Sequence, residues 1–364
     1  MDSDLKTRIE RVENSLLLQS EDETLNSRYK LRDRMEFYKV PSVSIAVINN
    51  GKIDWVKGYG VKEVGSNDPI DPQTLFQAAS ISKPVTATGV LKLVQSGKLN
   101  LDSDVEEKLV SWQIPENRFT KENKVTLRNL LSHTAGMTVH GFEGYSSDEP
   151  VPSLLEILNG EKPVNSDEIK VNSKLNQEFK YSGGGYVVIQ QLLEDITGKP
   201  FDEFMQEAVL DEIDMTRSTF RQPLSEAEVN AAVGHDDRGK PIDGSWHTYP
   251  EMAAAGLWTT PSDLAKFVIA IQNSIRGEEN SILDRQISRE MLTPQAGGWG
   301  LGFEIPEDNL ERYAHAGANE GYQCLLLSDR NTGQGAVIMT NSDRGLELAL
   351  EILASIEQEY GWNK

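Results

Sequence analysis

The chain has 364 residues, a length at which one large domain with a subdomain, or two domains, is expected. A count of 57 acidic against 36 basic residues gives a formal net charge of −21, which excludes nucleic acid and anionic membranes as partners by repulsion. Hydrophobic residues make up 38% of the chain, which is enough for a core of that size.

The N-terminal part predicts a helix and then a β-hairpin. Residues 3–37 are charged, with Leu, Ile and Val at helical intervals, and predict an N-terminal helix. Val43–Ile48 and Ile53–Tyr59 flank the turn sequence Asn-Asn-Gly, which is typical of a hairpin. We therefore expect two antiparallel strands from this part of the chain.

A helix with a serine at its start follows the hairpin. Residues 82–96 have apolar side chains at helical spacing, and Pro84 falls in the first turn, where proline is tolerated. Ser80 then lies at the positive end of the helix, and Lys83 lies one turn on, on the same face. A desolvated, neutral lysine could supply or share the base that a nucleophilic serine needs. The alternative is that Ser80 merely caps the helix and Lys83 is solvated.

A glycine-rich loop precedes another helix in the middle of the chain. Phe179–Tyr186 contains Tyr-Ser-Gly-Gly-Gly and leads into a helical run, Val187–Ile196, which places Tyr181 on the loop. A phenol has an unperturbed pKa of about 10, and a neighbouring ammonium such as that of Lys83 would lower this pKa. Tyr181 is thus a candidate acceptor for the proton of Ser80.

The C-terminal part predicts four short strands and a last helix. We expect the strands at Gly300–Ile305, Arg312–His315, Tyr322–Ser328 and Ala336–Thr340, and the helix from about Leu346 to Glu359. Small residues flank His315, and such side chains let a substrate backbone lie close to a strand edge.

The simplest arrangement of these elements is an α/β (α+β) fold. An antiparallel sheet flanked by helices would be built from both chain ends, residues 1–79 and 251–364, as an α/β sandwich. Residues 80–250 would form an inserted, mostly helical region. The candidate active site would lie in the cleft between the two regions.

Three motifs in a fixed order resemble those of a known family. The order Ser80-x-x-Lys83, then Tyr181-Ser-Gly, then His315-Ala-Gly is similar to the serine β-lactamase and penicillin-binding-protein-like family. That family includes class C β-lactamases, D-alanyl-D-alanine carboxypeptidases and related esterases and D-aminopeptidases. The resemblance implies a β-lactamase/transpeptidase-like fold, an antiparallel sheet flanked by helices with a helical region inserted.

The resemblance extends beyond these motifs. Leu130–Met137 is similar to the family signature Leu-Leu-x-His-Thr-Ser-Gly, and Ala255–Leu264 to its Gly-Gly-Leu-x-Ser-Thr-x-x-Asp segment. The similarity runs from about Val40 to Asn341, nearly the whole chain. We expect His133, within the first of these signatures, to tie a loop together by hydrogen bonds.

The resemblance also implies catalytic roles for four residues. Ser80 would be the acylated nucleophile, Lys83 would tune the protons around it, and Tyr181 would be the general base. The backbone N–H groups of Ser80 and Ala318 would form the oxyanion hole, a contribution of about 2.7–4 kcal/mol per donor. Whether Lys83 or Tyr181 takes the proton is left open by the sequence.

Three further residues are expected beside the substrate. His315 would add a polar or positive group facing the leaving group or a substrate carboxylate, and Gly317 would lie beside it. Many relatives have Tyr-x-Asn as the second motif, but Gly183 stands here in place of the asparagine. The lost hydrogen bond costs about 1–3 kcal/mol, which favours a smaller ester or amide over a β-lactam.

Three functions therefore remain open. The leading one is a serine hydrolase that forms an acyl-enzyme on Ser80 and cleaves an ester or a D-configured amide or peptide. The second is a class C-like β-lactamase or a penicillin-binding D,D-carboxypeptidase with the same nucleophile. The third is a non-catalytic binding protein that retains the fold.

The sequence lacks the motifs of several other classes of functional site. Neither Gly-x-Ser-x-Gly nor Gly-x-x-x-x-Gly-Lys-Ser/Thr occurs, and the five histidines show no metal-ligand spacing. We expect no metal and no cofactor, and a small-molecule ester, amide or peptide as the binding partner. The oligomeric state is open.

The predicted location is the cytoplasm. The chain has no run of 18 apolar residues and its first residues lack the pattern of a signal peptide, although a secreted or periplasmic protein trimmed of its signal would look the same. The single cysteine, Cys324, excludes an internal disulfide and lies in an apolar segment typical of a buried strand.

Overall fold

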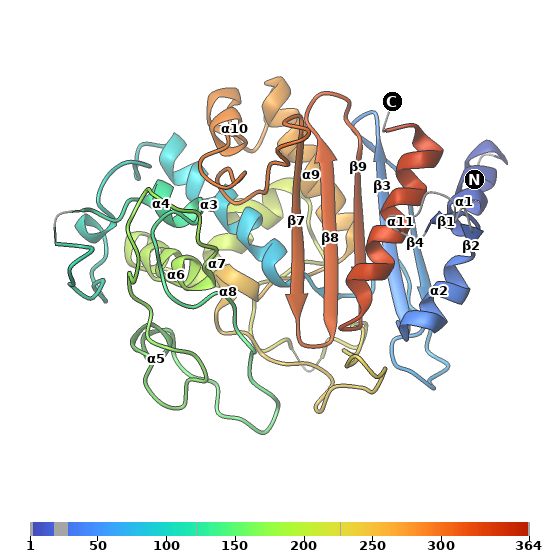
Figure 1. The fold of residues 1–364 in the computed structure, drawn as a ribbon, viewed down its shortest axis with the longest axis horizontal. Coiled ribbons are helices and arrows are strands. Elements are labelled where there is room, and N and C mark those ends of the chain that lie inside the picture. Colours follow the sequence, from blue (N-terminus) through green and yellow to red (C-terminus); the bar gives the residue numbers. More distant parts are fainter. Residues whose placement is uncertain (1–2, 18–27, 122, 226, 363–364) are drawn as a thin grey trace.

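An antiparallel sheet forms the centre of the computed structural model, which describes residues 3–17, 28–121, 123–225 and 227–362 (Figure 1). The sheet has five strands in the order β4-β3-β9-β8-β7. Their bounds are β3 Ser42–Asn49, β4 Lys52–Gly60, β7 Arg312–Asn319, β8 Tyr322–Asp329 and β9 Gly335–Thr340. Because β3 pairs with β9, both ends of the chain build the sheet, as the sequence predicts.

The predicted hairpin is β3 and β4. Asn50 and Gly51 join the two strands with φ angles of 52° and 70°. Positive φ at both central residues suits a two-residue hairpin turn, and asparagine followed by glycine adopts it at low cost. The hairpin is therefore confirmed, and its strands extend slightly beyond their predicted limits.

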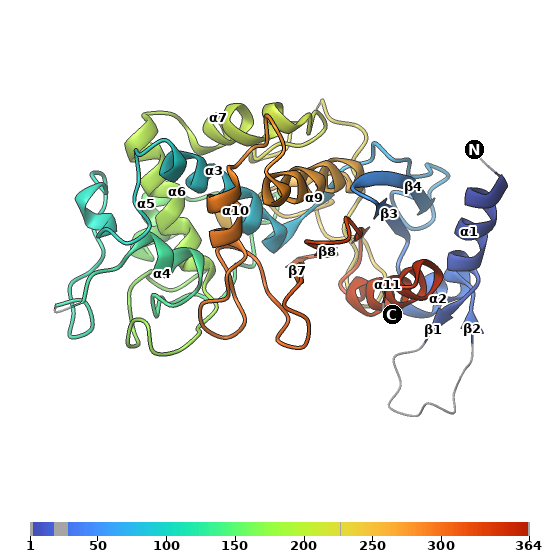
Figure 2. The same cartoon turned by 90° about the horizontal axis from the view of Figure 1, so that it is seen from above.

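Helices cover both faces of the sheet, so the predicted fold class is confirmed. The helix α11, Gly345–Tyr360, packs on β8 and β9, and α1, Ser3–Glu13, and α2, Leu31–Tyr38, pack against α11. On the other face, α9, Pro261–Arg276, packs on β3, β4 and β9 (Figure 2).

The remaining helices lie mainly beside β7, away from β4 (Figure 1). They are α3 Ser82–Gln95, α4 Leu127–Leu131, α5 Leu154–Asn159, α6 Gly183–Thr197, α7 Phe201–Met205, α8 Met252–Ala255 and α10 Arg285–Met291. Two short strands, β5 Phe76–Gln77 and β6 Trp258–Thr259, pair with each other. Across the described ranges, every helix falls short of the length and apolar character that a bilayer crossing requires.

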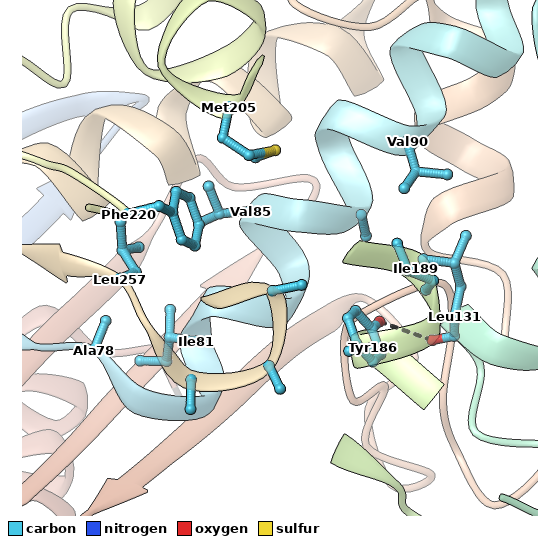
Figure 3. Close-up of a cluster of buried hydrophobic side chains, with 14 of the residues drawn as sticks. Ala78, Ile81, Val85, Val90, Leu131, Tyr186, Ile189, Met205, Phe220 and Leu257 are labelled. Atoms are coloured by element: carbon cyan, nitrogen blue, oxygen red, sulfur yellow. Dashed lines mark hydrogen bonds between the residues drawn. The ribbon is translucent and has the colours of Figure 1, made fainter. Parts of the chain in front are cut away.

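Buried apolar side chains form two clusters. One lies between the sheet and the helices α1, α2 and α11 and includes Ile45 and Ile352. The other is continuous from the α9 face of the sheet, at Val337, to α3 and α6, where it includes Val85 and Ile189 (Figure 3). The predicted sandwich and the predicted helical region thus share a core. The division into residues 1–79 with 251–364 and residues 80–250 stays a prediction.

The single N-terminal helix predicted over residues 3–37 is wrong in extent. The structure has the two helices α1 and α2 there, with the short strands β1, Leu16–Leu17, and β2, Arg28–Tyr29, paired between them. The part of this prediction at residues 18–27 lies outside the described residues.

The strand predicted at Gly300–Ile305 is also wrong. Half of these residues lie in bends, and Glu304 forms isolated bridges with Trp299 and with Ala314 of β7. Gly302 has a φ of 95°, and a Cβ atom there would lie 2.8 Å from the Cβ of Ala87 in α3. The chain turns at Gly302 because α3 approaches closely, and the apolar pattern of the segment reflects burial instead of a strand.

A buried ion pair joins α2 to α11. The Nε and Nη2 atoms of Arg34 donate to the Glu351 carboxylate at 2.8 and 2.7 Å, and the Tyr38 hydroxyl donates to it at 2.6 Å. The two charged side chains are 7% and 3% exposed. Removing one partner of such a pair leaves the other charge desolvated and unpaired, which costs about 3–5 kcal/mol.

Arg34→Met is therefore expected to lower the free energy of unfolding by about 3–5 kcal/mol, measured by urea denaturation. Adding Glu351→Leu should recover most of this loss, because no unpaired charge remains. Lys6→Ala, in an exposed pair with Glu10, is the control and should cost less than about 1 kcal/mol. A double variant as unstable as Arg34→Met would contradict the argument.

Candidate active site

Ser80 lies in a 3-10 turn, Ala79–Ile81, that leads directly into α3. The preceding residue, Ala79, is buried and has a φ of 50°, a conformation uncommon for a residue other than glycine. The Ala78 N–H donates to the Leu257 carbonyl at 2.8 Å, and the Ser82 hydroxyl donates to the Ala79 carbonyl at 2.6 Å. These bonds hold Ser80 on a fixed turn, whose first N–H groups have no acceptor within the turn.

Lys83 lies beside Ser80, and no carboxylate of the described residues forms an ion pair with it. Its Nζ atom is 3.0 Å from the Ser80 Oγ and donates to the Ala254 carbonyl at 2.9 Å. The same atom lies 5.0 and 5.7 Å from the ring centres of Tyr181 and Tyr186. Desolvation lowers the pKa of Lys83 from 10.5 to about 7, because these neutral neighbours replace water only in part. The amine is therefore a base that is partly free of its proton at neutral pH.

Tyr181 meets the same serine from another segment. Its hydroxyl forms a hydrogen bond with the Ser80 side chain, which favours the ionised phenol. Burial is the larger effect and raises the pKa of Tyr181 above its usual value of 10. We expected Lys83 to lower this pKa, and the structure reverses the direction because desolvation outweighs the hydrogen bond with Ser80. Tyr181 is thus a neutral phenol at physiological pH.

Aromatic rings hold Tyr181 in place. The ring of His133 stacks on it at 4.3 Å, and Trp299 approaches it edge-on at 5.4 Å. The His133 Nδ1 accepts a hydrogen bond from the Ser182 N–H at 3.1 Å, and the His133 carbonyl accepts one from the Lys180 N–H at 2.9 Å. The loop-tying role that the sequence predicts for His133 is confirmed by these bonds.

The free edge of β7 forms the wall opposite the helices. Ala314 exchanges two backbone hydrogen bonds with Glu304 at 2.9 and 3.0 Å, on the edge that faces away from β8. Backbone groups two residues apart in a strand point the same way, so the N–H groups of Ala316 and Ala318 face this edge too. Ala318 and Ser80 line the same cavity, which fits the predicted oxyanion hole.

Gly317 lets this edge approach the serine. A Cβ atom at Gly317 would lie 2.3 Å from the Ala78 carbonyl oxygen and 3.2 Å from the Ala79 Cβ. Real Cβ atoms do not come so close to a backbone oxygen, so any other residue would push β7 away from the turn that carries Ser80. Gly317 therefore sets the spacing between the two sides of the site.

His315 lies behind the cavity wall, and it is not among the residues that line the cavity. Its Nδ1 is 2.6 Å from the Ala316 carbonyl oxygen, which requires a proton on that nitrogen, and its ring packs against Trp299 at 5.1 Å. Burial, together with the nearby Lys83, lowers the pKa of His315 to about 3. The ring is thus neutral, and the positive charge considered at this position is not available at neutral pH.

Gly183 does not reach the cavity either. It is the first residue of α6, and its N–H donates to the His140 carbonyl at 2.9 Å. A Cβ atom at Gly183 would lie 2.9 Å from the ring of Phe142. The space beside Gly183 is therefore filled by Phe142, and His140 and Phe142 form this part of the cavity wall. No motif in the sequence indicates these two residues, and only the length of their loop could have drawn attention to it.

The cavity that joins these residues has a volume of about 270 Å³. The helical half supplies Ser80, Lys83 and Tyr181 to it, and the sheet supplies Ala318. A larger hollow of about 750 Å³ lies between α2 and β4. The described residues that line this hollow include no serine or cysteine. Ser80 and Lys83 both line the smaller cavity, which is therefore the candidate active site.

Comparisons with known proteins agree with this geometry. The Beta-lactamase family profile matches residues 28–358. Protein flp of Staphylococcus aureus (strain N315) is 24% identical over 312 residues, which make up 83% of this chain and 60% of that protein. The putative penicillin-binding protein PbpX of Bacillus subtilis (strain 168) is 24% identical over 80% of this chain and 68% of its own length. The aligned part thus spans only about 60% of the length of flp.

A solved structure shows the same arrangement of the chain. The octameric penicillin-binding protein homologue from Pyrococcus abyssi superimposes with a TM-score of 0.74 at 25% sequence identity. The superposition covers 90% of this chain and 77% of that one. The fold is therefore that of penicillin-binding proteins, as the motifs predict.

Gly317→Ala is expected to slow the acylation of Ser80 by about 100-fold, because a displacement of about 1 Å in a reacting group costs that much. The rate would be measured with p-nitrophenyl acetate. Gly185→Ala in α6 is the control and should keep the rate, since its Cβ would meet its nearest neighbour at 3.7 Å. Equal rates in the two folded variants would contradict the spacing role of Gly317.

Proposed function

Because the chain belongs to the β-lactamase family, we propose that it is a serine hydrolase that forms an acyl-enzyme on Ser80 and cleaves an ester or a D-configured amide or peptide. One observation carries this proposal. The amine of a desolvated lysine lies 3.0 Å from the hydroxyl oxygen of Ser80, in a cavity that is also lined by Ala318 of the sheet edge.

Acylation begins with the removal of the serine proton. Neutral Lys83 takes the proton from the Ser80 Oγ, and this oxygen attacks the substrate carbonyl carbon. The carbonyl oxygen becomes an oxyanion, which accepts hydrogen bonds from the N–H groups of Ser80 and Ala318. These donors are part of a fixed turn and a sheet edge, so they need no rearrangement when the charge develops.

Tyr181 passes the proton on to the leaving group. Its phenol stays neutral because burial raises its pKa, and it lines the cavity with its ring centre 5.0 Å from the Lys83 amine. It donates its proton to the departing oxygen or nitrogen and is reprotonated from Lys83. A water molecule then attacks the ester bond to Ser80, with Lys83 again as the base, and restores the serine. Lys83 is the proton acceptor in this scheme, and Tyr181 is the relay.

The second candidate is a penicillin-binding D,D-carboxypeptidase or a class C-like β-lactamase. The names of the relatives PbpX and the Pyrococcus abyssi homologue favour it. The substitution of Gly183 for asparagine, with Phe142 in the adjacent space, argues against the amide contact that such substrates use. We therefore place it behind the simpler ester or amide hydrolase.

Incubation with p-nitrophenyl acetate is expected to acetylate Ser80, detected by mass spectrometry of the peptide that contains it. Ser80→Ala should abolish both the adduct and the release of nitrophenolate. Ser3→Ala is the matched control, because Ser3 and Lys6 repeat the Ser-x-x-Lys spacing on the exposed helix α1. A folded protein without an adduct on Ser80 would instead support a non-catalytic binding protein.

The rate of hydrolysis should follow the protonation of Lys83. Since the base is the unprotonated amine and its pKa is lowered to about 7, kcat/KM is expected to rise tenfold per pH unit below about 7 and to level off above it. Lys83→Arg should reduce kcat/KM at least 100-fold, because arginine keeps its proton. Lys92→Arg, on the same helix, should leave the profile unchanged. A plateau reached only near pH 10 would contradict the role of Lys83.

A further inference from the structure

The cavity around Ser80 offers almost no positive charge to a substrate. Of the described residues that line it, Lys83 and His140 are the basic ones. Lys83 is occupied by Ser80 and the Ala254 carbonyl and gives up its proton near neutrality. A carboxylate that entered this cavity would lose its hydration without gaining a permanent ionic partner, which is strongly unfavourable.

Two basic residues close in sequence to described lining residues do not offer a free positive charge to the cavity. His315 is buried behind the wall as a neutral ring. Arg344 precedes α11, and its guanidinium group contacts two other side chains. The guanidinium carbon lies 5.2 Å from the ring centre of Tyr38, and the Nε atom lies 3.9 Å from the Glu347 carboxylate. The residue of α11 that does line the cavity is Leu346, which is apolar.

The charge of the whole protein acts in the same direction. A formal net charge of −21 creates a negative potential that repels anionic substrates over a distance set by the ionic strength. The remaining cavity wall is apolar or polar without charge: Phe142, Ala254, Ala255 and Ala316 are apolar, and Asn319 and Gln323 carry amides. Both the local and the long-range electrostatics therefore favour an uncharged substrate.

We propose that the Ser80 site selects uncharged esters or amides and discriminates against substrates that carry a carboxylate next to the scissile bond. The inference rests on the proposed serine hydrolase function and specifies its substrate class. Free peptide C-termini would thus be poor substrates, and blocked peptides or neutral esters good ones. The same cavity in a protein that uses a free carboxylate would need a cation where Leu346 or His315 stands.

Matched pairs of substrates test this selectivity. One pair is methyl 4-acetoxybenzoate and 4-acetoxybenzoate, and the other is N-acetyl-D-alanyl-D-alanine amide and the same peptide with a free carboxylate. We expect kcat/KM of the wild-type protein to be at least tenfold higher for the neutral member of each pair. Rates are corrected with Ser80→Ala and, for the esters, with the hydroxide-catalysed reaction. Added salt should reduce this ratio but not abolish it. Salt screens the long-range repulsion by the net charge, but it does not screen the cost of dehydrating a carboxylate inside the cavity.

A gain-of-charge variant tests the cause. Leu346→Arg places a guanidinium at the cavity wall and should raise the ratio of anionic to neutral turnover at least fivefold, whereas Leu346→Met should not change it. His140→Gln, which removes the exposed imidazole at the cavity, should also leave the ratio unchanged. An unchanged ratio in a folded, active Leu346→Arg variant would overturn the proposed cause.

Failure of this inference can be told apart from failure of the proposed function. Equal or faster Ser80-dependent hydrolysis of the anionic members would overturn the selectivity and leave the serine hydrolase intact. A loss of anionic turnover in His140→Gln would overturn the selectivity too, because it would identify His140 as a carboxylate partner. If neither the neutral nor the anionic substrates gave Ser80-dependent turnover, both proposals would fall.

Discussion

The burial of one amine beside one hydroxyl is the constraint on which the rest of the site depends. Lys83 has exchanged water for a backbone carbonyl, the Ser80 hydroxyl and the faces of two tyrosines. None of these partners carries a full negative charge, so the ammonium is poorly solvated and the pKa falls. A carboxylate in the same place would restore the charged form and remove the base. The groups around Lys83 must therefore stay neutral for the serine to be activated.

The architecture supplies this dry environment at some cost to stability. The helix α3 is buried over most of its length, and the apolar cluster around it continues to α6, where the Tyr186 hydroxyl is bonded to the Leu131 carbonyl (Figure 3). Within this frame lie a buried amine, a left-handed Ala79 and, at Ala318, a sheet edge that no further strand of the described ranges covers. Each of these features is unfavourable by itself, and a large shared core can hold them in place. The site is thus rigid because it is surrounded by packing, and its strained parts lie where chemistry needs them.

The sequence predicted the parts of this site that depend on local pattern. The Ser80 and Lys83 spacing at a helix start, the Asn-Gly hairpin and the paired C-terminal strands all follow from neighbouring residues. It could not predict the direction of the Tyr181 pKa shift, because that depends on how much water three distant segments exclude. The same holds for Phe142, which occupies the space beside Gly183, and for Gly302, where an apolar stretch bends because α3 lies against it. The Tyr181 pKa, the position of Phe142 and the bend at Gly302 all depend on packing between segments far apart in the chain. A local sequence pattern does not predict such packing.

The neutral state of His315 follows from the same electrostatic constraint. Lys83 lowers the pKa of His315, so the two groups interact, and a proton on one of them disfavours a proton on the other. In a site that excludes water, two neighbouring basic groups do not both stay protonated. The buried imidazole of His315 loses its proton at a much lower energy cost than the amine of Lys83. A permanent cation at position 315 would lower the pKa of Lys83 further and would attract carboxylates into the cavity. With a neutral imidazole there, desolvation alone sets the pKa of Lys83 near 7, and the cavity loses the anchor that a carboxylate needs. Activation of the serine and selectivity for uncharged substrates are thus two results of one distribution of charge.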